Sequence, residues 1–130
     1  MRGYVVICGV LLFAACYHGP SIYKFGPVRG PDGIGADLRL QETRVRGELL
    51  EVQDSALVVL TDSDKIVSVP LSGIRAGSFD KFGMIIGEGM NSHSALAKLR
   101  PFSRFPTGLT PELRARLLAA YGQTEAQVVR

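Results

Sequence analysis

The sequence predicts a mainly β domain with one C-terminal helix, whose core is a small, strongly bent five-stranded barrel or a curled antiparallel sheet. Three observations lead to this prediction. Between residues 37 and 79 the chain has short apolar runs separated by close turns, which is typical of small barrels. The stretch Val45–Leu60 has the pattern of a bent hairpin, and residues 109–122 have that of an amphipathic helix.

The N-terminal segment has the pattern of an export signal. Arg2 is followed by an uncharged apolar stretch that is shorter than the roughly 20 residues needed to span a bilayer. Residues Leu12–Cys16 (LFAAC) resemble the lipobox of bacterial lipoproteins, with Phe13 where that family usually has Leu. The resemblance implies that residues 1–15 are a signal peptide cut off by signal peptidase II. It also implies that Cys16 carries a thioether-linked diacylglyceryl group.

Residues 16–36 would then connect the lipidated cysteine to the folded unit. They contain several Gly and Pro residues without periodicity, which predicts a flexible tether. Removal of residues 1–15 would take Cys8 away, so no free thiol would remain and no disulfide is expected. Two other interpretations stay open: a plain secretory peptide in which Cys16 is incidental, and an uncleaved N-terminal anchor.

The hairpin Val45–Leu60 is the centre of the predicted β unit. Apolar or small residues alternate with charged ones up to Leu49, and the alternation then slips at Leu50. Such a slip indicates a β-bulge, which lets a strand bend sharply. A turn is predicted at Gln53–Ser55. The continuous apolar run Ala56–Leu60 indicates a strand that is covered on both sides or lies at the centre of a barrel.

Three further strands complete the predicted unit at residues 37–79. The first begins at Asp37, where Leu38 and Leu40 alternate with polar residues. The strand at Lys65–Leu71 is expected to lie at an edge or to end at Pro70, because proline has no N–H to donate. The last is expected at Ile74–Phe79.

Residues 80–108 are predicted to be an irregular, glycine-rich and partly helical connection. Phe82–Met90 contains three glycines among apolar residues, which fits either a weakened strand or a loop. A short helix is expected at Ser92–Leu99, ending before Pro101.

The helix at residues 109–122 has clear start and stop signals. Thr110 is a good N-cap, Pro111 suits the first helical position, and Gly122 is a natural C-terminal stop. An apolar stripe formed by Leu113, Leu117, Leu118 and Tyr121 predicts that this helix packs on an open end or face of the β unit. Residues 123–130 are predicted to be a frayed tail.

The charge balance does not indicate a dedicated nucleic-acid binder. The chain has 15 basic and 12 acidic residues, and the formal charge falls from +3 to +2 if Arg2 leaves with the signal. Basic residues do gather late in the chain, where they predict either a solvated face or contact with anionic lipid headgroups. These weak binding candidates are Lys98, Arg100, Arg104, Arg114 and Arg116.

No catalytic, metal or cofactor site is predicted. The two histidines, His18 and His93, lie far apart, and a metal site needs three or four ligands brought together. Asp62 and Asp64 lack the glycine and the distant glutamate of a calcium loop, so a turn is expected there. Ser92 and His93 lack the surrounding motif of a hydrolase.

The pattern Val45-x-Gly47-x-Leu49 followed by Asp54 and an apolar strand resembles the first half of the Sm-like fold, a strongly bent small barrel. RNA-binding members of that family carry an Asn shortly after the Asp and an Arg-Gly pair in the last strand. Here no Asn follows Asp54, and Ala76 separates Arg75 from Gly77. These departures argue against RNA binding, and a shared fold carries no function by itself.

The leading functional hypothesis is a non-catalytic, lipid-anchored protein of the cell envelope that faces outward from the cytoplasm. Its expected partners are the membrane, through Cys16, and another envelope protein. Two alternatives remain: an Sm-like nucleic-acid-binding protein with an uncleaved N-terminus, and an accessory or inhibitor of an envelope enzyme. The first alternative predicts salt-dependent RNA affinity, and the second a deep pocket with convergent polar groups.

Overall fold

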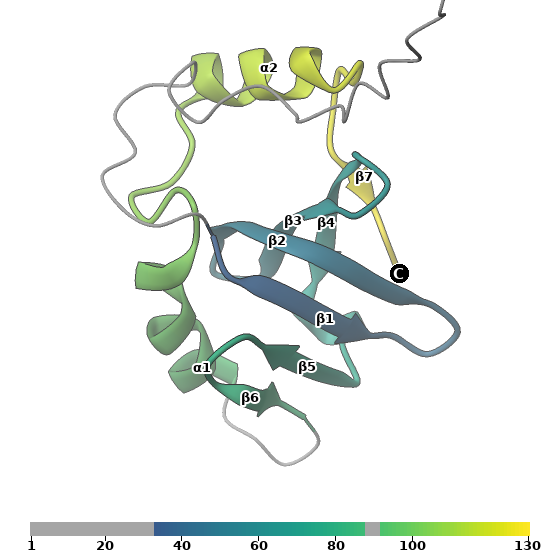
Figure 1. The fold of residues 1–130 in the computed structure, drawn as a ribbon, viewed down its shortest axis with the longest axis vertical. Helices are drawn as coiled ribbons and strands as arrows, with labels where there is room; N and C mark the ends of the chain where they lie inside the picture. The colour runs from purple at the N-terminus through teal and green to yellow at the C-terminus, as the bar shows by residue number, and fades with distance from the viewer. Residues whose placement is uncertain (1–32, 88–91) are drawn as a thin grey trace, which may run out of the picture.

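The computed structural model describes residues 33–87 and 92–130, which form one curved sheet with two helices packed against it (Figure 1). Within these residues the sheet has seven strands in the order β6-β5-β1-β2-β3-β4-β7. Neighbouring strands are antiparallel except β4 and β7, which are parallel. The elements are β1 (Gly35–Arg39), β2 (Arg44–Val52), β3 (Ala56–Thr61), β4 (Ile66–Pro70), β5 (Ala76–Phe79), β6 (Gly83–Ile86), α1 (Ser92–Leu99), α2 (Pro111–Ala120) and β7 (Gln127–Val128).

The expected mainly β fold with a C-terminal helix is confirmed, but the prediction of a five-stranded barrel is wrong. In the described part of the chain the sheet has two more strands and does not close. β6 pairs with the outer edge of β5, and β7 pairs with the outer edge of β4. The two edges that a five-stranded barrel would join are therefore already occupied.

The prediction for the C-terminal segment is also wrong, because residues 123–130 do not form a frayed tail. β7 pairs with Val67 and Ser68 of β4, and the Val129 N–H donates to the Ser68 carbonyl at 3.0 Å. This long-range pairing gives no signal in a local sequence pattern. The glycine-rich segment Phe82–Met90 was expected to be either a weakened strand or a loop. In its described part the structure has a strand, β6.

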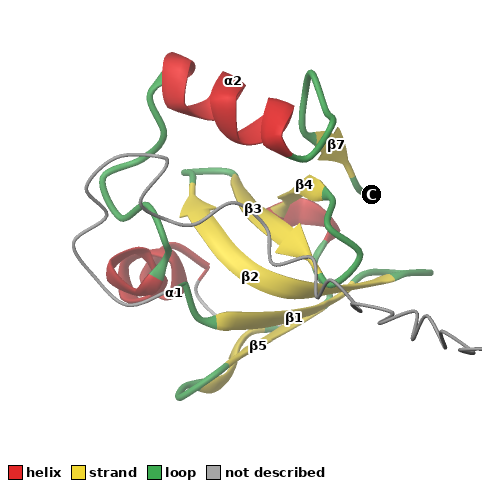
Figure 2. Cartoon of the chain, turned by 45° about the horizontal axis from the view of Figure 1, so that its top comes forward, coloured by secondary structure: helices red, strands yellow, loops and turns green. Residues whose placement is uncertain are grey.

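The predicted β-bulge is confirmed in β2. Leu49 pairs with Val59 and Glu51 pairs with Val58, so Leu50 is the extra residue on the bulged strand. Figure 2 shows how strongly β2 curves along the sheet. The shift in register brings Val52 onto the same face as Leu49, whereas regular alternation would place these two residues on opposite faces.

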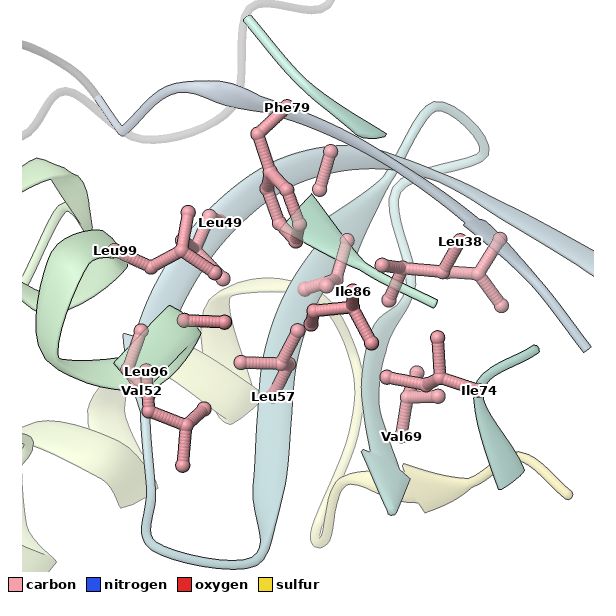
Figure 3. Close-up of a cluster of buried hydrophobic side chains, with 14 of the residues drawn as sticks. Leu38, Leu49, Val52, Leu57, Val69, Ile74, Phe79, Ile86, Leu96 and Leu99 are labelled. Carbon is pink, nitrogen blue, oxygen red and sulfur yellow. The ribbon is translucent and has the colours of Figure 1, made fainter. Parts of the chain in front are cut away.

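Two apolar clusters cover opposite faces of the central strands. The larger lies inside the curl of the sheet and includes side chains from α1, such as Leu96 and Leu99 (Figure 3). The smaller lies beneath α2, where Leu117 and Leu118 pack on the sheet. The expectation that β3 is covered on both sides is confirmed, because its residues alternate between the clusters. The sheet residues of the smaller cluster are Leu50, Val58 and Ile66, with Leu60 packed against them.

Helix α2 begins and ends as predicted. The Thr110 hydroxyl accepts a hydrogen bond from the Leu113 N–H at 3.2 Å, which caps the first turn. At the other end the Gln123 N–H donates to the Leu118 carbonyl at 2.9 Å, and Gly122 has φ +70°. This is the Schellman arrangement that glycine favours. It ends the helix and directs the following residues back toward β4.

Candidate functional site

The lipidation candidate Cys16 lies outside the described residues, so acylation there stays a prediction. The five basic candidates lie in the part that the structure describes. Lys98 is exposed in the last turn of α1, Arg100 and Arg104 lie between the helices, and Arg114 and Arg116 lie on α2.

Three of these arginines form ion pairs with carboxylates of β2 or of the turn that follows it. Arg100 pairs with Asp54 at 3.2 Å, Arg104 with Glu48 at 3.5 Å, and Arg114 with Glu51 at 3.1 Å. Their guanidinium groups therefore contact carboxylates of the sheet and its turn, and they do not together form one anion-binding surface. Contact of the basic candidates with lipid headgroups stays a prediction.

Sequence reasoning missed these carboxylates because it counted only the acids between the arginines along the chain. Glu51 is 63 residues from Arg114 in sequence. Glu51 is buried although charged, because the bulge places it beside Leu50 on the side of α2. A glutamate next to a slip in the apolar pattern was the one available signal.

Arg104 is the centre of a buried polar cluster. Its side chain is only 8% exposed, and its backbone N–H donates to the Leu49 carbonyl at 3.0 Å. The partner Glu48 also accepts a hydrogen bond from the Gly33 N–H at 3.0 Å. Burial raises the pKa of the nearby Tyr121 phenol, while the positive charge of Arg104 acts in the opposite direction. The cluster fastens residue 33 and the segment before α2 onto β2, which is a structural role.

A further ion pair links β1 to the start of β2. Asp37 accepts a hydrogen bond from Arg44 Nε at 2.7 Å and a second from the same guanidinium. These bonds to Arg44 hold the pKa of Asp37 below its usual range.

We expect the Asp37–Arg44 pair to make the free energy of unfolding depend on pH. Because the unfolded chain binds a proton at Asp37 more readily than the folded one, stability falls as pH drops below about 4, the ordinary range of Asp. Urea midpoints of the wild type, Asp37→Asn and Arg44→Gln at pH 6 and pH 3 test this. Both variants should lose less stability than the wild type over this interval. An equal loss in all three proteins would contradict this role for the pair.

The best-formed candidate binding site is a mainly apolar cleft of about 320 Å³ between α2 and β4, which we call the α2–β4 cleft. Its floor comes from Val58 and Ile66 of the sheet, and one wall from Leu117 and Leu118 of α2. Residues 124–126 of the C-terminal segment form the other wall. The volume of this cleft is near the lower end of the range of small-molecule pockets.

The polar residues around this cleft are positioned by long-range bonds. Arg114 lines it and is held by Glu51, whose two carboxylate oxygens lie 3.1 and 3.3 Å from the same guanidinium nitrogen. Gln123 stands at the start of the C-terminal wall and bonds to the Ile66 backbone. The cleft therefore offers an apolar floor with a fixed charge pair at one side.

A larger hollow of about 580 Å³ opens elsewhere, beside Gln41, Ser72–Arg75 and Arg130. Its lining is largely polar, with Ile74 as its one large apolar residue. The Arg75 guanidinium donates to the Gln41 side chain there at 3.3 Å. We regard it as a less specific site, because few buried groups converge on it.

The remaining chemical candidates are not brought together. Within residues 33–87 and 92–130, no three His, Cys, Asp or Glu side chains are grouped so that they could hold a metal ion. Asp62 and Asp64 lie in the turn between β3 and β4, as expected, and Asp64 adopts φ +60°. His93 is exposed on α1.

Within residues 33–87 and 92–130, no helix has the length and apolar character that a membrane span requires. Comparison with models of known protein families, with curated proteins and with solved structures finds no match for this chain.

Proposed function

We propose that this chain is a lipid-anchored, non-catalytic protein of the bacterial cell envelope whose folded unit binds another envelope component. The observation that carries the proposal is the apolar N-terminal stretch that ends in Leu12–Cys16, with small residues directly before the cysteine. Two acyl chains on Cys16 would make the anchoring stable, since each buried methylene contributes about 0.8 kcal/mol. The folded unit would then act outside the cytoplasm.

The α2–β4 cleft supports a binding role for the folded unit. It is mainly apolar and lies between a helix and a strand. The ion pair Arg114–Glu51 lies along one side of it. The pairing of Arg100, Arg104 and Arg114 with carboxylates favours a protein or apolar ligand over a nucleic acid, because phosphate binding draws on unpaired cations.

We also propose that the unit is a diverged Sm-like fold. Two observations support this: β2 is sharply bent by its bulge, and β1 pairs with β5, which joins the two ends of the segment 35–79. The added strands β6 and β7 distinguish it from the simple bent barrel of that family.

Substitution of Cys16 tests the anchor. We expect the wild type, produced in a bacterial host and fed an alkyne-tagged fatty acid, to incorporate the label and to remain in the membrane fraction. Cys16→Ala should lose the label completely, because the thioether forms on that sulfur alone. Globomycin should cause the uncleaved wild-type precursor to accumulate, since it inhibits signal peptidase II.

The matched control is Cys8→Ala, which removes the other cysteine of the chain. It should keep the label and the processing of the wild type, since Cys8 lies within the predicted signal. If wild type and Cys16→Ala were equally unlabelled, the lipid anchor would have to be abandoned.

A further inference from the structure

The outer edge of β4 is occupied by the chain's own C-terminal segment, Gln123–Val129. The side-chain amide of Gln123 bonds to both backbone groups of Ile66: it accepts from the Ile66 N–H at 2.8 Å and donates to the Ile66 carbonyl at 2.9 Å. This is the pair of bonds that a residue on a neighbouring strand would make. β7 and the Val129 N–H then continue the pairing along Val67 and Ser68.

The side chains of β7 contribute little to this pairing, although Ala126 and Val129 on either side of it are partly buried. β7 has only two residues, both exposed, and its pairing with β4 is parallel, which is the less stable arrangement. The side chain of Val128 is 55% exposed. Among the described residues, Val128 and Met84 are the two exposed large apolar residues. A strand this short can be released at small cost.

The α2–β4 cleft is also incompletely filled by this segment. Ala126 is the one apolar residue of the wall formed by residues 124–126, and it is only partly buried. A methyl group leaves most of a cleft of about 320 Å³ unfilled. The side chains around it, such as Leu117 and Val58, would gain contacts from a larger apolar group.

We propose that the β4 edge and the α2–β4 cleft together form an acceptor site for an extended peptide segment of a partner protein. The peptide would pair with Ile66–Ser68 as an added strand and place a large apolar side chain in the cleft. Residues 123–129 occupy this site in the free chain and are displaced by the partner. The chain's own segment shows the required chemistry, because it already supplies strand-like pairing and an apolar side chain at the cleft. This inference rests on the proposed binding role and does not depend on the lipid anchor.

The test uses the full chain in detergent and a fluorescein-labelled peptide with the sequence of residues 123–130 carrying Ala126→Leu. We expect the peptide to bind the Gln123→Ala variant at least about tenfold more tightly than the wild type, because the competing segment loses two hydrogen bonds. The matched control is Gln41→Ala, a glutamine of the β1–β2 turn that lies outside the cleft. It should bind the peptide as the wild type does.

A second variant works in the opposite direction. Ala126→Leu in the full chain should fill the cleft from within and weaken peptide binding several-fold relative to the wild type. In Gln123→Ala the Ile66 amide loses its side-chain acceptor, so hydrogen exchange at this amide should slow when the peptide binds. The Ala126→Leu variant also keeps the test decisive if Gln123→Ala does not fold.

Equal peptide affinity for the wild type and the folded variants would overturn the proposal. So would dimerisation of Gln123→Ala without peptide binding, because the occupant would then be the segment of a second copy. None of these results bears on Cys16, which is tested separately by fatty-acid labelling.

Discussion

Gly47→Ala is expected to lower the free energy of unfolding by about 3 kcal/mol, the upper end of the usual cost of overpacking. A Cβ added to Gly47 would lie 2.0 Å from the Leu60 carbonyl oxygen and 2.7 Å from the Thr61 Cα. Both are backbone atoms of β3, so no side chain can rotate away, and β2 and β3 must separate. Equilibrium urea denaturation followed by circular dichroism measures the change.

The matched control is Gly73→Ala. A Cβ at Gly73 would meet only the Leu40 side chain, at 4.0 Å, which is ordinary van der Waals contact. We expect this variant to stay within about 0.5 kcal/mol of the wild type. If both variants unfolded at the same urea concentration, β2 and β3 would not be packed as closely as described.

Glu48→Ala is expected to lower the free energy of unfolding by about 3 kcal/mol, because it leaves the buried Arg104 guanidinium without its counter-charge. The cost also includes the hydrogen bond that Glu48 accepts from the Gly33 N–H. The double variant Glu48→Ala with Arg104→Met should recover part of the loss, since it removes the buried charge as well. The same denaturation measurement compares the three proteins.

Asp54→Ala is the control for this second prediction. Asp54 also pairs with an arginine, Arg100, but its side chain is fully exposed, and pairs of this kind contribute about 0–1 kcal/mol. A loss in Glu48→Ala no greater than that in Asp54→Ala would contradict the assigned importance of the buried pair.

The strands that could be predicted are those whose signals are local. Burial of the central strands can be predicted from the alternation before Leu49, the slip at Leu50 and the apolar run Ala56–Leu60. Each side chain there is apolar or polar according to whether its face of the sheet is buried or exposed. The ends of α2 were predictable for the same reason. Its capping residues, Thr110 and Gly122, act on the backbone a few positions away.

The features that could not be predicted depend on contacts between distant segments. Gln123 and Ile66 are 57 residues apart, and nothing near either residue indicates that a side-chain amide will serve as a strand partner. β7 has two exposed residues and therefore no apolar pattern. The α2–β4 cleft depends on that same pairing, so the sequence indicated the helix face but not the cleft beside it.

The division of the core into two clusters on opposite faces of the same strands has a consequence for how the molecule opens. Because β2, β3 and β4 each contribute side chains to the clusters on both faces, neither cluster can dissolve while the other stays intact. The central strands therefore form one cooperative unit, whose amide hydrogens exchange only when the whole sheet comes apart. The outermost strand β7 contributes no side chain to either buried cluster, and only the partly buried Ala126 and Val129 beside it pack against them, so β7 can detach and rejoin while that unit stays folded.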